Sequence, residues 1–166
     1  MNKIGIIMGS DSDLPIAEKA IEKLAEYGIN YEVHVYSAHR TPEETIRFAK
    51  EARQNGFDAL IGIAGKAAHL AGVIAANTTL PVIGVPVNSS LEGMDALLST
   101  VQMPPGIPVA TVGIDGAANA AILAAEILAV SDEKLAQLLL KKRIEAKEAV
   151  LEKNHRIEKK WNGGTK

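Results

Sequence analysis

The sequence of 166 residues contains no cysteine, which excludes disulfides, thiolate metal ligands and cysteine nucleophiles. Aromatic residues make up only 4% of the chain, too few to build a platform on which nucleic-acid bases stack. No apolar run reaches the roughly 18 residues that a membrane span needs, because Gly, Pro, Asn and Asp interrupt every candidate. The formal net charge is −2 and no block of like charge occurs. We therefore expect neither a nucleic acid nor a membrane as partner.

The residues that are present are typical of a packed globular protein. Hydrophobic residues make up 47% of the chain, and the length suits one domain around one core. We expect a single domain over residues 1–166, with a core at 1–130, a C-terminal helix at about 132–160 and a frayed tail at 162–166. The N-terminus enters a strand pattern without a basic segment or a cleavage site, which indicates a soluble cytoplasmic protein.

Short apolar segments alternate with segments whose apolar residues recur at helical spacing. The predicted strands cover residues 3–8, 31–37, 58–65, 80–87 and 108–114. The predicted helices cover residues 14–27, 42–56, 66–78, 94–103, 117–129 and 132–160. This alternation predicts a three-layer α/β fold, in which helices cover both faces of a five-stranded parallel sheet, and we expect the flavodoxin-like strand order. Ligands of such sheets bind beyond the carboxyl ends of the strands, where neighbouring crossovers diverge.

Polar or glycine-rich turns follow three of these strands, and the first of them is "MGSDSD" at residues 8–13. Gly9 permits a tight turn, and Ser10, Ser12 and Asp13 precede a helix. Free backbone N–H groups and the helix dipole at such a place attract an anion, for example a phosphate. A purely structural alternative is that Ser12 or Asp13 only caps the helix.

The second turn, "SAHR" at residues 37–40, places a histidine beside an arginine. Arg40 can hold a phosphate or a carboxylate with paired donors, and His39 can exchange protons near neutral pH. The alternative is a surface histidine beside an arginine in an ion pair. Thr41, with Pro42 next and Glu44 three residues on, predicts a capping box at the start of the following helix.

The third turn lies within "AGKAAHLAG" at residues 64–72. Gly65, Ala67 and Ala68 offer backbone amides to an anion and leave room for a planar ligand. His69 is either part of the site or a structural histidine at the start of a helix. Because the three turns converge on one crevice, a shared site is favoured over three separate structural explanations.

Other motifs of known chemistry are missing. His34 and His155 have no partners at the spacing of metal ligands, and the chain contains no P-loop, Gly-x-Ser-x-Gly or Gly-x-Gly-x-x-Gly motif. The remaining chemistry is acid–base catalysis on a small anionic substrate, with no metal and no cofactor.

Seven segments of the chain resemble the class I N5-carboxyaminoimidazole ribonucleotide mutases of bacterial purine synthesis. In order, they are "MGSDSD", "SAHRTP", "AAHLAG", "LPVIGVPV", "LLSTVQMP", "GIPVATV" and "NAAILAAEIL". The resemblance spans residue 3 to about residue 130. It implies an isomerase of IMP biosynthesis that moves carbon dioxide from the exocyclic nitrogen of its ribonucleotide substrate to carbon 4 of the imidazole ring. The implied product is 4-carboxy-5-aminoimidazole ribonucleotide.

The same resemblance implies roles for individual residues. It makes His39 the proton carrier and Arg40 the phosphate contact. The implied substrate-binding residues are Ser10, Asp13, Ser37, Arg40, Gly65, Ala67, Ala68, His69 and Leu70. An apolar pocket that retains carbon dioxide is expected from Ala67, Ala68, Leu70 and Met103. The family further implies a homo-oligomer, an octamer with sites shared between neighbouring subunits.

Two residues depart from the family pattern, and two alternatives remain open. Lys66 stands where the family usually has glycine, and Ala71 where it usually has proline. Lys66 is similar to the basic residue of the class II enzymes, which carboxylate aminoimidazole ribonucleotide directly with carbon dioxide, but the retained "AAHL" favours the mutase. A flavodoxin-like binding or receiver module is the other alternative. Gly65 and Lys66 replace the aspartate expected of a receiver, and strand ends three to five offer no aromatic ring to a flavin.

Overall fold

The computed structural model describes residues 2–162, so most of the predicted frayed tail, residues 163–166, lies outside the described residues. The chain divides into two compact units, residues 1–128 and residues 129–166, and each is described by itself. The single domain remains a prediction.

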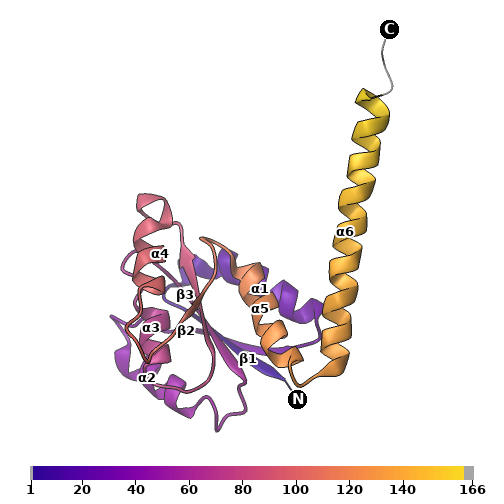
Figure 1. Ribbon diagram of the computed structural model, residues 1–166. Helices are drawn as coiled ribbons and strands as arrows, with labels where there is room; N and C mark the ends of the chain where they lie inside the picture. Colours follow the sequence, from indigo (N-terminus) through magenta and orange to yellow (C-terminus); the bar gives the residue numbers. More distant parts are fainter. Residues whose placement is uncertain (1, 163–166) are drawn as a thin grey trace. The chain divides into compact units, whose positions relative to one another are not determined.

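A parallel sheet of five strands in the order β2-β1-β3-β4-β5 forms the centre of the first unit (Figure 1). The strands are β1 (Lys3–Met8), β2 (Asn30–Val35), β3 (Ala59–Gly65), β4 (Val82–Val87) and β5 (Ala110–Thr111). All four pairings are parallel. The α/β fold and the flavodoxin-like strand order are thereby confirmed.

Helices cover both faces of this sheet (Figure 1). The helices α2 (Pro42–Glu51), α3 (Leu70–Ala75) and α4 (Met94–Val101) lie on one face, and α1 (Leu14–Glu26) and α5 (Ala117–Ala129) on the other. Two short 3-10 turns, η1 (Asp11–Asp13) and η2 (Leu91–Gly93), precede α1 and α4. Both faces of the central strands are therefore buried, and Ile4, Ile6 and Ile7 of β1 are fully inaccessible.

Small residues allow the helices to approach the sheet closely. A Cβ added to Gly62 of β3 would lie 3.1 Å from Cα of Ala71 in α3. A Cβ added to Gly84 of β4 would overlap the methyl group of Thr100 in α4. α3 therefore packs directly against β3, and its first residue, Leu70, lines the candidate site.

α2 ends at Glu51 rather than near residue 56, and most other ends shift by one to three residues. Three further differences are larger or lie at the candidate site. α3 begins at Leu70 rather than at residue 66, because two tight turns precede it. In these turns, the N–H of Ala68 donates to the carbonyl of Lys66, and the N–H of His69 donates to the carbonyl of Ala67, both at 2.8 Å. β5 has two residues instead of 108–114, although the N–H of Val112 still donates to the carbonyl of Gly84 at 3.1 Å.

The third difference is the capping box. The hydroxyl of Thr41 does not cap α2. It accepts from the N–H of Ser37 at 2.8 Å and lies 3.2 Å from the carbonyl oxygen of Ser37, to which it donates. The prediction of a capping box with Glu44 is therefore wrong, whereas the helix start at Pro42 is confirmed. Thr41 closes the turn that carries His39 and Arg40.

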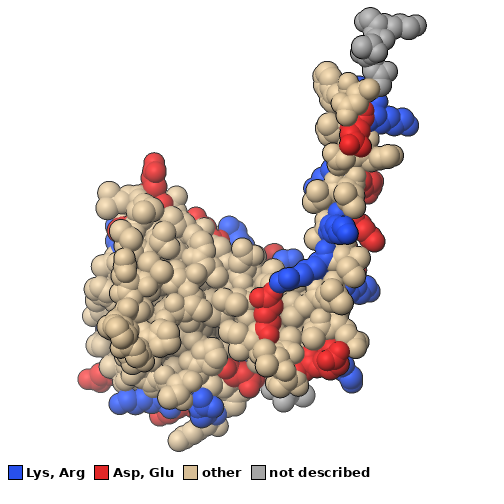
Figure 2. All heavy atoms as spheres, in the orientation of Figure 1, with Lys and Arg blue, Asp and Glu red and all other residues tan. Residues whose placement is uncertain are grey.

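The second unit consists mainly of the helix α6 (Glu133–Trp161), which confirms the predicted long C-terminal helix. The carboxylate of Asp132 accepts from the N–H of Leu135 at 3.1 Å and caps its first turn. Charged side chains of both signs are distributed along α6 (Figure 2). Its exposed apolar side chains are Leu140, Ile144, Val150, Leu151, Ile157 and Trp161. No helix among residues 2–162 is long and apolar enough to cross a membrane.

Candidate active site

The three turns singled out in the sequence meet in one cavity of about 540 Å³ at the carboxyl ends of β1, β2 and β3. β1 and β3 are neighbours in the sheet, but the crossover from β1 leads to β2 on one side and that from β3 leads to β4 on the other. The cavity therefore lies at the topological switch point, where open α/β sheets bind ligands. Every predicted site residue except Ala68 and Met103 lines it.

In the first turn, the hydroxyl of Ser10 accepts from the backbone N–H of Ser12 at 3.3 Å and from the hydroxyl of Ser12 at 2.9 Å. Asp13, which lines the same cavity, is only 7% exposed. Burial raises the pKa of the Asp13 carboxyl, a hydrogen bond from the backbone of Ser10 opposes that rise, and the negative charge of Asp11 adds to it. This turn thus combines hydroxyl groups with a carboxyl whose charged form is disfavoured.

In the second turn, hydrogen bonds fix the side chain of Arg40. Its Nη2 donates to the carbonyl oxygen of Gly9 at 3.0 Å, and its Nε donates to the hydroxyl of Ser37 at 3.4 Å. The same hydroxyl accepts the backbone N–H of Arg40 at 3.2 Å. An arginine has five N–H donors, so the remaining ones can bind an anion in the cavity. The contact with Gly9 joins the turns after β1 and β2.

The two histidines of the site contact each other directly. Nε2 of His39 lies 2.9 Å from Nδ1 of His69, and the two rings meet edge to face with centroids 5.0 Å apart. One nitrogen must carry a proton and the other must accept it, because two facing N–H groups would repel. The pair can therefore share one proton between two rings that both line the cavity.

The third turn is held against the segment that follows β4. The backbone N–H of Lys66 donates to the hydroxyl of Ser89 at 3.2 Å, and a Cβ added to Gly65 would overlap the side chain of Ser89. Lys66 adopts a left-handed conformation with φ of 55°, which disfavours any residue with a side chain. Gly65 is therefore required by packing, whereas Lys66 is held in strain.

The charged residues of the lining favour an anionic ligand. Arg40 and Lys66 contribute two cations, whereas Asp13 contributes the only carboxyl group among the lining residues that the structure describes. Helix and turn N–H groups add to this bias. Within residues 2–162, no three His, Cys, Asp or Glu side chains come together as a metal site.

Two residues assigned to the pocket by resemblance lie elsewhere. Ala68 is 2% exposed and does not line the cavity. Met103 does not line it either, since its sulfur lies 3.2 Å from where a Cβ of Gly72 would stand. The apolar lining predicted for carbon dioxide thus reduces to Ala67 and Leu70, together with Ala38 and Ala64, which the sequence did not single out.

Ser89 and the contact between the two histidines escaped prediction from the sequence. Ser89 follows β4, so its place beyond a carboxyl strand end was a usable signal. The contact between His39 and His69 had no such signal, because 30 residues separate them.

Fold and cavity together define a flavodoxin-like α/β protein with a cavity lined by arginine and two histidines at the switch point of its sheet. The model of the AIR carboxylase family matches residues 3–149, and the chain belongs to this family.

Individual relatives agree with this assignment. The chain is 56% identical to the N5-carboxyaminoimidazole ribonucleotide mutase of Methanocaldococcus jannaschii, over 93% of this chain and 96% of that one. It is 52% identical to the mutase of the same name from Bacillus subtilis, over 93% and 97% of the two chains. The crystal structure of Treponema denticola PurE matches with a TM-score of 0.85 and 29% identity, over 95% of this chain and 99% of that one.

Proposed function

We propose that this protein is an isomerase that converts N5-carboxyaminoimidazole ribonucleotide to 4-carboxy-5-aminoimidazole ribonucleotide in purine biosynthesis. The observation that carries the proposal is an identity of 52–56% to relatives named for this mutase, over more than nine tenths of the chain. The cavity supports it, because an anion-binding arginine lies next to a pair of histidines that can share a proton.

Substrate binding begins with the phosphate in this proposal. The guanidinium group of Arg40 is held by Gly9 and Ser37, so it meets a phosphate without losing much side-chain freedom. The hydroxyl groups of Ser10 and Ser12 line the same cavity, and they can donate to the phosphate by giving up their present bonds, from Ser12 to Ser10 and from Ser10 to the carboxylate of Asp11. The neutral form of Asp13, which burial favours, can donate to the ribonucleotide, and its charged form can accept from a hydroxyl.

Proton transfer is assigned to His39. As the bond between the carboxyl carbon and the exocyclic nitrogen breaks, His39 donates a proton to that nitrogen and carbon dioxide is released. Carbon 4 then attacks carbon dioxide, and His39 takes the proton that carbon 4 loses. The proton returns to its donor, so the reaction is balanced without another reactant. His69, hydrogen-bonded to His39, orients the ring and receives part of its charge.

The released carbon dioxide must stay in the cavity between the two steps. Ala67 and Leu70 at the start of α3, with Ala38 and Ala64 opposite, provide a small apolar surface. Such a surface offers no hydrogen bonds to water, and the bound ribonucleotide closes the opening.

Direct carboxylation of aminoimidazole ribonucleotide is a second candidate. Lys66 favours it, because this cation in the cavity could attract bicarbonate or a carboxylate. The deciding experiment measures product formation, without ATP, from the carbamate substrate and separately from aminoimidazole ribonucleotide with bicarbonate. The mutase proposal expects efficient turnover of the carbamate. Efficient turnover only of aminoimidazole ribonucleotide would make the protein a direct carboxylase, and activity with neither would reject both.

We also propose that the protein works as a homo-oligomer larger than a dimer, an octamer by resemblance, in the cytoplasm. Its support is a line of exposed apolar side chains on η2 and α4, which are between 46% and 75% exposed: Leu91, Met94, Leu98 and Val101. Their spacing places the last three on one helical face. Light scattering at assay concentration tests this proposal, and the mass of a monomer would contradict it.

A further inference from the structure

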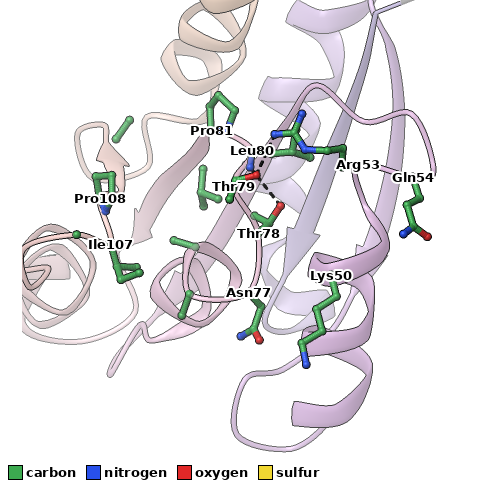
Figure 3. Close-up of a pocket in the computed structure, with 15 residues that line it drawn as sticks. Lys50, Arg53, Gln54, Asn77, Thr78, Thr79, Leu80, Pro81, Ile107 and Pro108 are labelled. Atoms are coloured by element: carbon green, nitrogen blue, oxygen red, sulfur yellow. Dashed lines mark hydrogen bonds between the residues drawn. The ribbon is translucent and has the colours of Figure 1, made fainter.

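A second and larger cavity, of about 930 Å³, lies at the opposite end of the strands. It is bordered by the C-terminal end of α2, by the loop between α3 and β4, and by the segment 106–108 before β5 (Figure 3). It shares no lining residue with the candidate active site. We refer to it as the amino-end cavity, because it opens where β4 and β5 begin.

Two cations line this cavity on the side of α2. Lys50 and Arg53 are three residues apart, so they lie on the same side of that helix and its end. Within residues 2–162, neither side chain forms an ion pair, and no Asp or Glu is among the lining residues. The positive charge of the amino-end cavity is therefore not neutralised by the described part of the chain.

The same side of the cavity also offers uncharged groups that can form hydrogen bonds with a ligand. Nη2 of Arg53 donates to the hydroxyl of Thr79 at 3.0 Å, which holds the guanidinium beside the loop (Figure 3). The hydroxyl of Thr78 accepts from the N–H of Leu80 at 3.2 Å, so its own proton can be donated. The amide nitrogen of Asn77 donates to the carbonyl of Val73 at 2.8 Å, which leaves the amide oxygen as an acceptor.

The facing wall is apolar. It consists of Ile107 and Pro108, with Ala110 at the start of β5, whereas Leu80 and Pro81 continue the loop that carries Thr79. Figure 3 shows Ile107 and Pro108 across the cavity from Lys50 and Arg53. A ligand that fits both walls carries a negative charge at one end and a less polar body at the other.

We propose that the amino-end cavity binds a phosphate monoester of about the size of a mononucleotide. Arg53 can hold two phosphate oxygens with paired donors, and Lys50 adds a point charge. Thr78 and Asn77 can bond the hydroxyl groups of a sugar, while the proline and isoleucine side chains contact a ring. The volume is within the range of small-molecule sites. This second site is independent of the proposed mutase reaction.

Isothermal titration calorimetry at low ionic strength tests the proposal, with adenosine 5′-monophosphate, inorganic phosphate and adenosine as probes. The protein carries Arg40→Ala, which weakens phosphate binding in the active site. We expect one bound adenosine 5′-monophosphate per chain, weaker binding of inorganic phosphate and none of adenosine. Low ionic strength is needed because salt screens exposed charges.

Two variants in this background locate the binding site. Lys50→Ala/Arg53→Gln should weaken adenosine 5′-monophosphate at least about tenfold, since it removes both charge-assisted contacts. Arg47→Gln is the matched control, because it removes an exposed cation from the same helix outside the cavity. Thr79→Val, which frees Arg53 without removing charge, should weaken binding by a smaller factor.

The proposal is overturned if Lys50→Ala/Arg53→Gln binds as tightly as its parent, or if Arg47→Gln loses as much affinity. Equal affinity for adenosine and its monophosphate would show that the cations do not contribute to binding. Equal affinity for inorganic phosphate and the monoester would show that the apolar wall does not contribute to binding. Thermal unfolding confirms that each variant is folded, and Lys50→Ala alone replaces the double variant if that one unfolds. Mutase activity enters none of these measurements.

Discussion

The two cavities at opposite ends of the same sheet differ in how their polar groups are held. At the carboxyl end, side chains from different turns bond one another or a neighbouring backbone: His39 to His69, Arg40 to Gly9, and Lys66 to Ser89. At the amino end, a hydrogen bond from Arg53 to Thr79 links the end of α2 to the loop between α3 and β4. Catalysis needs groups fixed in advance, whereas binding tolerates adjustment. The comparison predicts that single changes at the carboxyl end have effects beyond their own contact.

The largest expected effect is on His39. His39→Asn removes the proposed proton carrier, and the loss of a positioned acid–base group costs about 10²–10⁴-fold in rate. We expect kcat to fall at least about a hundredfold with little change in substrate binding, measured by steady-state kinetics on the carbamate. Lys50→Ala/Arg53→Gln, at the other cavity, should keep the parental kcat.

The matched control for this change is His155→Asn, which alters an exposed histidine of α6. Near-normal turnover of His39→Asn would transfer the role of proton carrier to His69, which the corresponding His69→Asn variant would then reveal. A fall in kcat for the amino-end double variant would show that the two cavities are coupled.

The strand order and the meeting of the three turns could be predicted from the sequence, because both follow from alternating local patterns and from the geometry of parallel sheets. The same patterns predicted α5 at residues 117–129 as observed. These local patterns gave wrong predictions where contacts between side chain and backbone in the folded chain determine the local structure. Thr41 has the right neighbours for a capping box, but its hydroxyl is used by the backbone of Ser37 instead.

Side-chain pairing across turns could not be predicted. The sequence identifies His39 and His69 as candidates, but no local pattern indicates that their nitrogens lie 2.9 Å apart in the folded chain. Likewise, Lys66 has a left-handed backbone, and its N–H donates to Ser89, which lies 23 residues away. No propensity scale favours lysine in that conformation.

The next effect in size concerns the packing of the third turn. Gly65→Ala places a methyl group against Ser89, and overpacking of this kind costs about 1–3 kcal/mol. We expect the free energy of unfolding, measured by urea denaturation, to fall by that amount. Turnover should also fall, because Lys66 and His69 belong to the same turn. Gly113→Ala is the control, since an added Cβ there meets nothing within 4 Å. Equal effects of the two substitutions would contradict the role assigned to Ser89.

A smaller effect is expected at the strained residue of the same turn. Lys66→Gly relieves a left-handed φ of 55° and should raise the free energy of unfolding by about 0.5–1 kcal/mol, after the larger entropy of glycine in the unfolded chain is included. Lys66→Ala keeps the strain and should not gain stability. Both variants lose the cation, so both should raise KM for the carbamate by a similar factor. If Lys66→Ala were also stabilised, the charge of Lys66, not its backbone conformation, would be what lowers the stability of the parent.

The smallest effect is on stability at Asp13, and its sign depends on pH. Burial raises the pKa of this carboxyl above its ordinary value of 3.8, so the folded state binds the proton more tightly than the unfolded chain. The contribution of Asp13 to stability therefore falls as the pH rises from 3.8 through the raised pKa.

Asp13→Asn removes this titration and keeps an acceptor for the backbone of Ser10. The variant should have a higher Tm than the parent near neutral pH, and the difference should shrink as the pH falls through the raised pKa toward 3.8. Substrate binding should weaken at the same time, since Asp13 lines the active site. Thermal unfolding of both proteins over this pH range measures the difference directly. A Tm difference that does not change with pH would mean that burial of the charge at Asp13 has no part in the stability of this end of the sheet.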